Sequence, residues 1–511
     1  MARYAAIDVG SNSVRMEAAE VSPPQAPRIL ASDREVTRLG ESVFARGVVS
    51  QEAMEATCAV LARMAETWRQ LDVAGVRAVA TSAIRDTRNQ AEFLERASAA
   101  AGTPVEIISG REEARLIHLG VESGWPQVGR RVLIVDIGGG SAEIIAAENG
   151  HLREAFSRPL GAVRLQSLFL RDDPPTRRQL RQLEEYIDGR LAPALKRLAG
   201  TRWDRAIATS ATAAAVAGAV GRLGRTAREA ADRRRVTTAQ VRRLYARLFA
   251  LPLAGRRKTA GIGPRRAEII VPGITVLLRC LEAFQLPAVY YCRAGVRDGI
   301  IADLAARGVG SELSRLGRDE RREVEAMSRR FGVAPAHARQ VAGLARALFV
   351  GLQPLHGLTP EWGRILEAAA YLHDIGHFVS GSGHHKHSYY VVSNSDLPGF
   401  TSREREWVAL LCRYHRKSLP AAAHGVFQSL SSGEQRALAL LIPLLRLADS
   451  LDRGHDQKVR EVECRVNGGE AVLVLRAPAD VSLDQWAAER AGEVFRQVYN
   501  IPLVVARSRT P

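Results

Sequence analysis

The sequence predicts an α/β protein built on a duplicated phosphate-binding turn, followed by a helical segment and a small α+β tail. Three observations support this. The segment Leu133–Ile145 reads as a buried strand, an acidic residue, three glycines, a serine and a second strand. The same pattern, Asp-x-Gly-small-small-Ser, occurs 128 positions earlier, beginning at Asp8. From about residue 306 the apolar spacing becomes helical, and ten of the twelve histidines lie beyond residue 336.

The turn inside Leu133–Ile145 has the chemistry of a phosphate site. Its three glycines lack a Cβ, so the chain turns tightly and several N–H groups can face one anion. Asp136 ends the buried strand, where its carboxylate can hold Mg²⁺ on phosphate oxygens. A glycine-rich hairpin with a structural aspartate is the alternative for a single turn.

The repeat favours the phosphate site. The first copy, Ala5–Ser13, is again an aliphatic strand, an aspartate, a glycine and small residues ending in serine. Two copies predict a duplicated βαβ-type unit whose hairpins face each other across a cleft. The phosphate-binding residues are then predicted to be Ser11, Asn12, Ser13, Gly138, Gly139, Gly140 and Ser141.

Several segments resemble the exopolyphosphatase and guanosine pentaphosphatase family of the actin-like superfamily. They are DVGSNSVRM, TSAIRDTRN, ISGREEARLIHLG, DIGGGSAEII and PLGAVRL, and the resemblance extends almost to the carboxyl terminus. It implies two actin-like (ribonuclease H-like) domains around a cleft, an all-α HD-type domain and a small α+β tail. The expected ranges are 1–125, 126–305, 306–460 and 461–511.

The resemblance also implies an activity and a set of metal ligands. The expected reaction is Mg²⁺-dependent removal of the terminal phosphate from inorganic polyphosphate, with guanosine pentaphosphate as the alternative substrate. Asp8, Asp136 and Glu143 are the expected metal ligands. Relatives of this kind lead us to expect a homodimer.

Two catalytic candidates follow predicted strands. Arg85 lies just past the strand Val76–Ala80, on the usual ligand side of an α/β sheet, where its guanidinium can contact phosphate. A surface ion pair with Asp86 is the alternative. Ser109 and Glu112 have capping-box spacing, which assigns Glu112 to the helix start and leaves Glu113 free.

The resemblance places the water-activating glutamate of the family on Glu113. A carboxylate there can position water and accept its proton. The alternative is an ordinary first-turn glutamate favoured by the helix dipole. One departure from the family pattern is Ala211, which replaces a glycine in Thr209–Thr212 and puts close approach of that backbone to a ligand in doubt.

The net charge of +17 is unevenly distributed. Residues 201–270 contain 16 lysines and arginines and 4 acidic residues, so this segment supplies +12. A cluster such as Arg233–Arg235 favours a polyanionic partner, and a solvated basic face is the alternative. Nucleic acid is disfavoured because few aromatic residues are interleaved for stacking on bases.

The helical segment contains the order His, His-Asp, Asp. His373 and Asp374 are adjacent, His337 precedes them on an amphipathic helix, and Asp449 follows. This order resembles the HD phosphohydrolase superfamily and suits Mn, Fe, Co or Zn, and Mg less well. The alternative is a helical domain without chemistry. Further ligands or phosphate contacts can come from His384, His385, His387 and His415.

The remaining features predict a cytoplasmic enzyme. Arg3 and Asp8 interrupt any secretory signal, and no apolar run approaches about 18 residues, so we expect no membrane contact. Five scattered cysteines fit a reducing compartment. An actin-like kinase or chaperone is disfavoured by Glu113 and by the lack of a sugar-site pattern, whereas a non-catalytic polyphosphate-binding module would not need Glu113.

Overall fold

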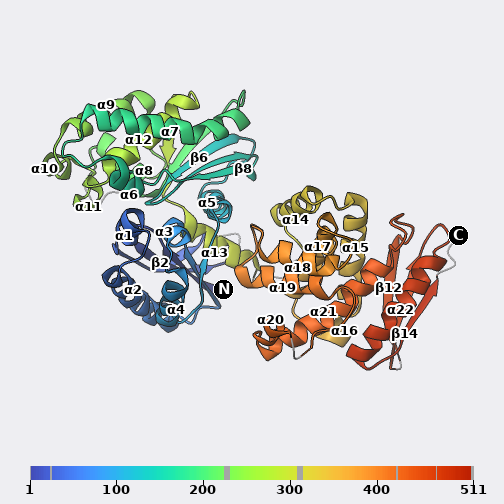
Figure 1. The fold of residues 1–511 in the computed structure, drawn as a ribbon. Coiled ribbons are helices and arrows are strands. Elements are labelled where there is room, and N and C mark those ends of the chain that lie inside the picture. Colours follow the sequence, from blue (N-terminus) through green and yellow to red (C-terminus); the bar gives the residue numbers. More distant parts are fainter. Residues whose placement is uncertain are drawn as a thin grey trace. The chain divides into compact units, whose positions relative to one another are not determined.

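The computed structural model describes residues 2–22, 26–223, 231–307, 315–421, 424–467 and 469–507. The chain forms two compact units, Met1–Ala306 and Arg307–Pro511, and each is described by itself (Figure 1). Within the described residues, no helix has the length and apolar character needed to cross a membrane. All five cysteines are free.

The first unit contains two mixed sheets. One has the order β3-β2-β1-β4-β5, and the other β10-β11-β9-β6-β7-β8. The strands of the first sheet are β1 (Ala2–Val9), β2 (Val14–Val21), β3 (Arg28–Glu35), β4 (Gly75–Ala80) and β5 (Val105–Ile107). Those of the second are β6 (Arg131–Ile137), β7 (Ala142–Glu148), β8 (His151–Arg158), β9 (Arg205–Thr209), β10 (Arg235–Thr237) and β11 (Ala288–Tyr291).

The two sheets repeat one topology. In each, the first strand pairs antiparallel with the second and the second with the third, while the first also pairs parallel with the fourth. The neighbouring strand in each sheet is also parallel: β5 pairs with β4, and β11 pairs with β9. This equivalence confirms the duplication predicted from the two Asp-x-Gly turns. The strand pair predicted on either side of Asn149-Gly150 is also present, as β7 and β8.

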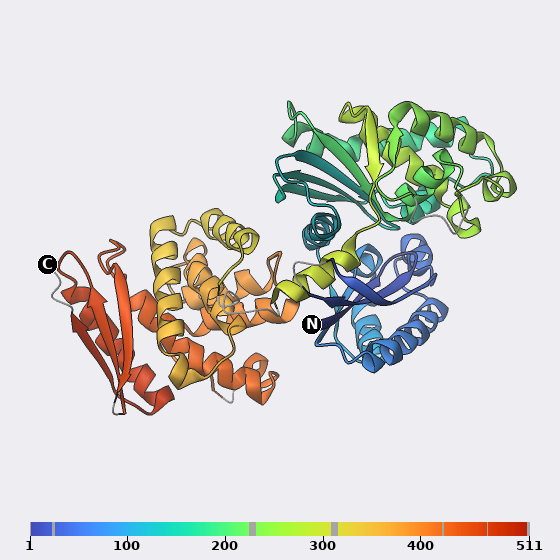
Figure 2. The same ribbon diagram turned by 180° about the vertical axis from the view of Figure 1, so that it is seen from behind.

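Helices cover the outer faces of the two sheets (Figures 1 and 2). Each sheet with its helices is called a lobe here. Ile7 and Val9 of β1 point to the same side of the first sheet, because side chains alternate along a strand, and they pack on the helices of the first lobe. These helices are α1 (Leu39–Arg46), α2 (Gln51–Gln70), α3 (Ser82–Asp86) and α4 (Gln90–Ala101). In the second lobe they are α6 (Ala162–Phe169), α7 (Arg177–Arg197), α8 (Ser210–Val220), α9 (Thr238–Ala250), α10 (Leu253–Arg257), α11 (Pro264–Ala267) and α12 (Ile270–Ala283).

Helix α5 (Gly110–Gly124) packs on both sheets. Its Leu116 joins the core beneath the first sheet, with Ala6 of β1, and its Ile117 joins the core beneath the second, with Ile134 of β6. Helix α13 (Val296–Arg307) crosses α5 closely at Gly299. The contact leaves no room for a side chain there, since a Cβ on Gly299 would lie 1.8 Å from the Leu116 carbonyl oxygen. The amino-terminal turn of α5 is therefore fixed between the lobes.

The second unit is helical with a small sheet, in line with the predicted change at about residue 306. Its core is continuous from Leu316 to Val505. The helices are α14 (Arg318–Arg330), α15 (Pro335–Gly351), α16 (Gln353–His356), α17 (Glu361–Leu372), the 3₁₀ helix η3 (Ile375–Phe378), α18 (His384–Ser393), α19 (Ser402–Tyr414), α20 (Gly425–Gln428) and α21 (Ser432–Ser450). The tail adds β12 (Glu461–Asn467), β13 (Glu470–Arg476), α22 (Ser482–Tyr499) and β14 (Leu503–Arg507).

Candidate active site

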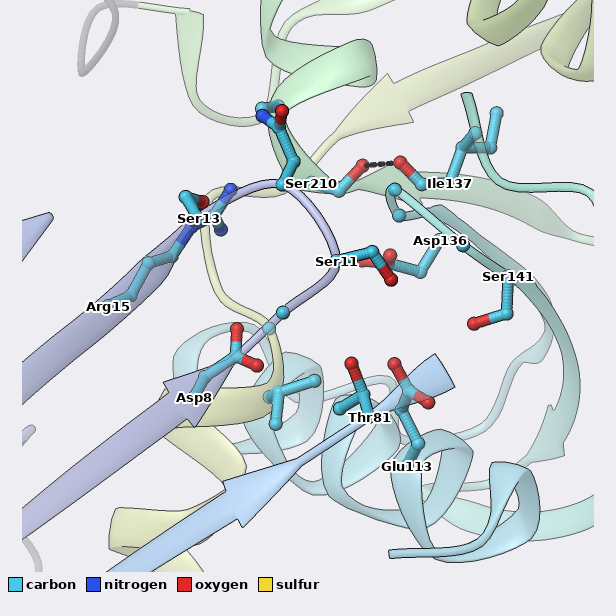
Figure 3. Close-up of a pocket in the computed structure, with 18 of the residues that line it drawn as sticks. Asp8, Ser11, Ser13, Arg15, Thr81, Glu113, Asp136, Ile137, Ser141 and Ser210 are labelled. Atoms are coloured by element: carbon cyan, nitrogen blue, oxygen red, sulfur yellow. Dashed lines mark hydrogen bonds between the residues drawn. The ribbon is translucent and has the colours of Figure 1, made fainter. Parts of the chain in front are cut away.

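The two predicted hairpins line one cavity and have the same internal geometry. In the first, the Gly10 N–H donates to the Ser13 carbonyl at 3.1 Å. In the second, the Gly138 N–H donates to the Ser141 carbonyl at 3.0 Å. The hairpins touch, since a Cβ on Gly139 would lie 3.1 Å from the Ser11 Cβ. All seven predicted phosphate-binding residues are among the residues that line this cavity (Figure 3).

The hairpins offer backbone N–H groups to a ligand, because two of their carbonyl oxygens already accept hydrogen bonds from neighbouring segments. The Ser11 carbonyl accepts from Gly40 at 2.6 Å, and the Gly139 carbonyl accepts from Val163 at 2.9 Å. Among the described residues, six N–H groups of the two hairpins donate to no protein acceptor: those of Ser11, Asn12, Ser13, Gly139, Gly140 and Ser141. Converging N–H groups of this kind bind anionic oxygens.

Strand register places the carboxylates on one face. Asp136 lies directly opposite Glu143 in the β6–β7 ladder, so both side chains point to the same side of the sheet. Asp8 is the penultimate residue of β1, as Asp136 is of β6. Figure 3 shows Asp8, Asp136 and Glu113 facing the space between the two hairpins.

The carboxylates offer oxygen atoms to a cation. The Thr209 hydroxyl donates to Asp136, and the Ser157 hydroxyl donates to Glu143 Oε1 at 2.8 Å. The other oxygen of Glu143, Oε2, is buried without a hydrogen-bond partner. An orphaned carboxylate oxygen beside a second carboxylate is costly unless a cation or proton compensates it. The donor set therefore fits a hard divalent ion.

The same enclosure raises the pKa values of these acids. Burial raises the pKa of Asp136 to about 6, although the hydrogen bond from Thr209 lowers it. Burial, followed by the charges of Glu113 and Asp136, raises the pKa of Glu143 well above its ordinary value. Burial also raises the pKa of Asp8, against the charges of Arg15 and Arg297. A bound cation would favour the ionised forms.

Glu113 lies in the first turn of α5 and lines the cavity. Burial raises the pKa of its carboxyl to about 7, although Arg85 lowers it. Arg85 Nη1 donates to Glu113 Oε2 at 2.9 Å and to the Ile108 carbonyl at 2.7 Å. Arg85 thus contacts the candidate base, and its alternative partner from the sequence, Asp86, pairs with Arg164 instead. A carboxyl with a pKa near 7 can exchange a proton with water at neutral pH.

The expected role of Glu112 was wrong in part. Ser109 does cap α5, since its hydroxyl accepts from the Glu112 N–H at 3.1 Å. The Glu112 carboxylate, however, lies in a buried ion-pair cluster, bonded to Arg115 Nε at 2.7 Å and to Arg77 Nη1 at 3.1 Å. Asp303 of α13 joins the same cluster. Glu112 therefore anchors α5 while Glu113 is left to face the cavity.

Sequence reasoning missed the basic residues of the cavity. Arg15 lies opposite Asp8 in the β1–β2 ladder, and Arg266, Arg293 and Arg297 also line the cavity. A signal for Arg15 was present, because it follows Asp8 by seven residues as Glu143 follows Asp136. The other three come from segments far from both hairpins in the sequence, Arg266 on α11 and Arg293 and Arg297 after β11.

The turn at Thr209–Thr212 contains one residue in the left-handed region, Ser210, at φ 72°. The Ser210 hydroxyl donates to the Ile137 carbonyl at 2.8 Å, as drawn in Figure 3. Both Ser210 and Ala211 line the cavity.

The four residues predicted as a second metal site converge in the second unit. His373 Nε2 lies 3.4 Å from Asp449 Oδ1 and 3.7 Å from Asp374 Oδ2. His337 Nε2 lies 3.8 Å from Asp449 Oδ1. His384 and His415 join the cluster, with their Nε2 atoms 3.1 Å apart. The side chains come from α15, α18 and α21 and from the residues just beyond α17 and α19.

Two lobes of equivalent topology, with facing anion-binding hairpins and a buried carboxylate set, define a phosphate-processing α/β enzyme. Residues 18–307 match the Ppx/GppA phosphatase family, and residues 320–489 match domain III of Ppx/GppA phosphatases. The chain belongs to the Ppx/GppA phosphatase family and is a phosphohydrolase.

Individual relatives agree with this assignment. The chain is 27% identical to a guanosine-5'-triphosphate,3'-diphosphate pyrophosphatase of Vibrio vulnificus, over 98% of each chain. A protein of the same name from Vibrio parahaemolyticus is 27% identical over 93% of this chain and 92% of the relative. The Ppx/GppA family member of Aquifex aeolicus, whose crystal structure is known, has 28% sequence identity to this chain. The two structures superpose with a TM-score of 0.54 over 60% of this chain and 99% of the Aquifex chain.

Proposed function

We propose that the first unit hydrolyses the terminal phosphoanhydride bond of inorganic polyphosphate in an Mg²⁺-dependent reaction. The observation that carries this proposal is the pairing of two equivalent hairpins, with six acceptor-free N–H groups, against Glu113 on a separate helix. The hairpins would hold the terminal phosphate groups. Asp8, Asp136 and Glu143 would hold Mg²⁺, which neutralises phosphate charge when bound.

The side chains of this protein supply the rest of the reaction. Glu113 would accept the proton of the attacking water as its oxygen bonds to the terminal phosphorus. Arg85 would orient the Glu113 carboxylate through their 2.9 Å bond. Arg15, Arg293 and Arg297 would stabilise negative charge on the phosphate chain. The P–O bond to the rest of the chain then breaks, releasing phosphate.

The second candidate is removal of the 5'-terminal phosphate from guanosine pentaphosphate by the same groups. It is favoured by the two full-length Vibrio relatives, whose names specify that class of nucleotide. We expect the protein to release phosphate from long-chain polyphosphate and from guanosine pentaphosphate at different kcat/KM in parallel Mg²⁺ assays. No release from either substrate would contradict both candidates, and release from the nucleotide alone would select the second.

The basic segment, residues 201–270, gives only partial support for a surface that binds long polyphosphate chains along their length (a track). Several of its arginines are paired, including Arg242 with Glu282, Arg256 with Asp173 and Arg257 with Glu268. Arg233 and Arg235 are exposed, and Arg233 also donates to the Gly124 carbonyl at 2.8 Å and lies 3.9 Å from Asp232. We take these two as candidates for contact with polyphosphate.

Charge reversal of Arg233 and Arg235 is expected to weaken binding of long polyphosphate more than binding of short chains. Each lost phosphate contact also lowers the salt dependence of affinity. The measurement is the dissociation constant against salt for two chain lengths, with Arg63→Glu and Arg96→Glu on α2 and α4 as a control of equal charge. An equal loss at both chain lengths would rule out a track.

We further infer a domain organisation from the family resemblance. Residues 1–125 and 126–305 would form the two actin-like domains, 306–460 an HD-type domain and 461–511 a small tail. A homodimer in the cytoplasm would be the working form. Support for the HD assignment comes from the convergence of His337, His373, Asp374 and Asp449.

A further inference from the structure

Helix α6 fixes the three glycine carbonyls of the second hairpin. Those of Gly138 and Gly139 accept from backbone N–H groups in the first turn of α6, at 3.0 and 2.9 Å. The carbonyl of Gly140 is held differently, because it accepts from a side chain, the Nε atom of Arg164, at 2.7 Å. Arg164 also belongs to α6, so the beginning of one helix holds all three carbonyls.

These bonds determine where the hairpin N–H groups point. In a planar trans peptide unit the C=O and N–H bonds point in opposite directions, so a carbonyl held by α6 directs the N–H of the next residue away from α6. The N–H groups directed in this way are those of Gly139, Gly140 and Ser141, three of the six that donate to no protein acceptor among the described residues. Arg164 therefore directs the N–H of Ser141, which lines the cavity.

The guanidinium of Arg164 also contacts the first lobe. Its Nη2 atom donates to the Ser82 hydroxyl at 3.0 Å and pairs with the Asp86 carboxylate. Its Cζ atom lies 4.0 Å from the centre of the Phe44 ring, a cation–π contact. Phe44 belongs to α1, on which α6 packs (Figure 1). One side chain therefore contacts the second hairpin and two helices of the first lobe, α1 and α3.

Helix α3 carries a residue of the proposed reaction. Arg164 contacts the first and the last residue of this short helix. Arg85, which donates to the Glu113 carboxylate at 2.9 Å, lies between those two contacts. The position of Arg85, and through it that of the candidate base, is therefore tied to the second hairpin by Arg164.

Two other arginines form ion pairs across the lobes, and both are more exposed. Arg38 pairs with Glu268 at 2.9 Å, and Arg265 pairs with Glu35 at 3.2 Å. The arginine side chains of these pairs are 44% and 64% exposed, whereas that of Arg164 is 15% exposed. Within the described residues, neither of these two side chains donates a hydrogen bond to a hairpin. Exposed ion pairs of this kind contribute little, so Arg164 differs from them in burial and in what it contacts.

We propose that Arg164 is a positioning residue for phosphate hydrolysis in the first unit. It directs the Ser141 N–H at the phosphate, and it holds the second hairpin and Arg85 in fixed relative positions. Its bonds to Gly140 and Asp86, which belong to different lobes, make both effects depend on contact between the lobes. This inference rests on the proposed function of the hairpin cavity. Because preorganised donors stabilise charge that develops in the transition state, Arg164 acts mainly on kcat.

The first test is Arg164→Lys in the full-length protein, with phosphate release from polyphosphate as the measurement. Lysine keeps the charge but has one nitrogen in place of the planar fork, so it cannot bond to Gly140 and Asp86 in the same geometry. We expect kcat to fall by about 10–100-fold, less than the loss of a whole oxyanion donor costs. KM should change little, because the other hairpin N–H groups still bind phosphate. The matched control is Arg38→Lys, which should keep kcat within about twofold.

The second test asks whether Arg164 acts through the first lobe. Asp86→Asn removes its charged partner, and this carboxylate is 47% exposed, so the fold should be retained. We expect kcat to fall by about 3–10-fold in the wild-type background and no further in the Arg164→Lys background, since residues that act together are not additive. A kcat within about twofold of wild type in either single variant, or an equal loss from Asp86→Asn in both backgrounds, would overturn the inference.

Hydrogen exchange distinguishes this inference from the proposed function. Arg164→Lys should speed amide exchange at the beginning of α6 and in α3, where the Arg85 N–H donates to the Thr81 carbonyl at 3.1 Å, and leave α2 unchanged. If the wild type releases no phosphate, the proposed function fails, and unchanged exchange in both segments would then overturn the role of Arg164 as well. Circular dichroism verifies the fold of each variant, and if Arg164→Lys does not fold, the kcat of Asp86→Asn decides.

Discussion

Glu113→Gln is expected to lower phosphate release from polyphosphate by about 10²–10⁴-fold, because removing a general base typically costs that much. The amide keeps the size of the side chain but cannot accept the proton of the attacking water. Binding should persist, since the hairpin N–H groups are untouched. The measurement is kcat and KM on polyphosphate, and we expect the loss to fall on kcat.

The matched control is Glu122→Gln, near the other end of the same helix. Glu122 Oε2 accepts from the Gln127 N–H at 3.0 Å and lies outside the hairpin cavity. Its substitution should leave kcat within about twofold, as expected for a site away from the chemistry. A near wild-type rate in Glu113→Gln would remove this residue as the base. Wild-type kcat/KM should also rise with pH through about 7, as Glu113 ionises.

Asp136→Asn is expected to reduce activity by about 100-fold or more and to stabilise the metal-free fold at alkaline pH. The loss of activity follows from weaker cation binding, which removes several kcal/mol of charge stabilisation. The gain in stability follows from the pKa of Asp136, which is raised to about 6 from 3.8. A raised carboxyl pKa contributes stability at low pH that is lost as pH rises through the folded value.

The stability difference is therefore confined to one pH range. Below about pH 4 both proteins should unfold at similar temperatures. Above about pH 6, in chelator, the variant should be more stable by on the order of 1–3 kcal/mol, since one pKa unit corresponds to about 1.4 kcal/mol. Thermal midpoints at pH 4 and pH 8 measure this, and added Mg²⁺ should reverse the order. Asp33→Asn, an exposed partner of Arg63, is the control and should shift little.

The sequence predicted the parts of the cavity that have a local pattern. The two hairpins and the aspartates at their strand ends repeat one motif, and alternation along a strand places Glu143 beside Asp136. The role of Glu112 could not be predicted, because its partner Arg77 lies on β4 and Asp303 lies on α13. Capping-box spacing is a local pattern, whereas a buried ion cluster depends on tertiary packing.

In the histidine cluster, too, some residues follow a sequence pattern and others are brought in only by tertiary packing. The order of His337, His373, Asp374 and Asp449 was visible because it resembles a known pattern. The place of His377 and His415 on the other side of Asp374 depends on the bend after α17 and on the angle between α18 and α19. Metal occupancy at this cluster and in the hairpin cavity stays a prediction.

The duplicated halves carry residues of opposite charge type at one equivalent position, and this difference has a consequence for a chain-like substrate. Seven residues after the aspartate, the first half carries Arg15 and the second half carries Glu143. A polyphosphate chain reads the same from either end, so it has no direction of its own. Two identical halves would accept it equally in both orientations. Unlike side chains at matching points remove that equivalence, so we expect the two ends of a bound chain to meet different groups.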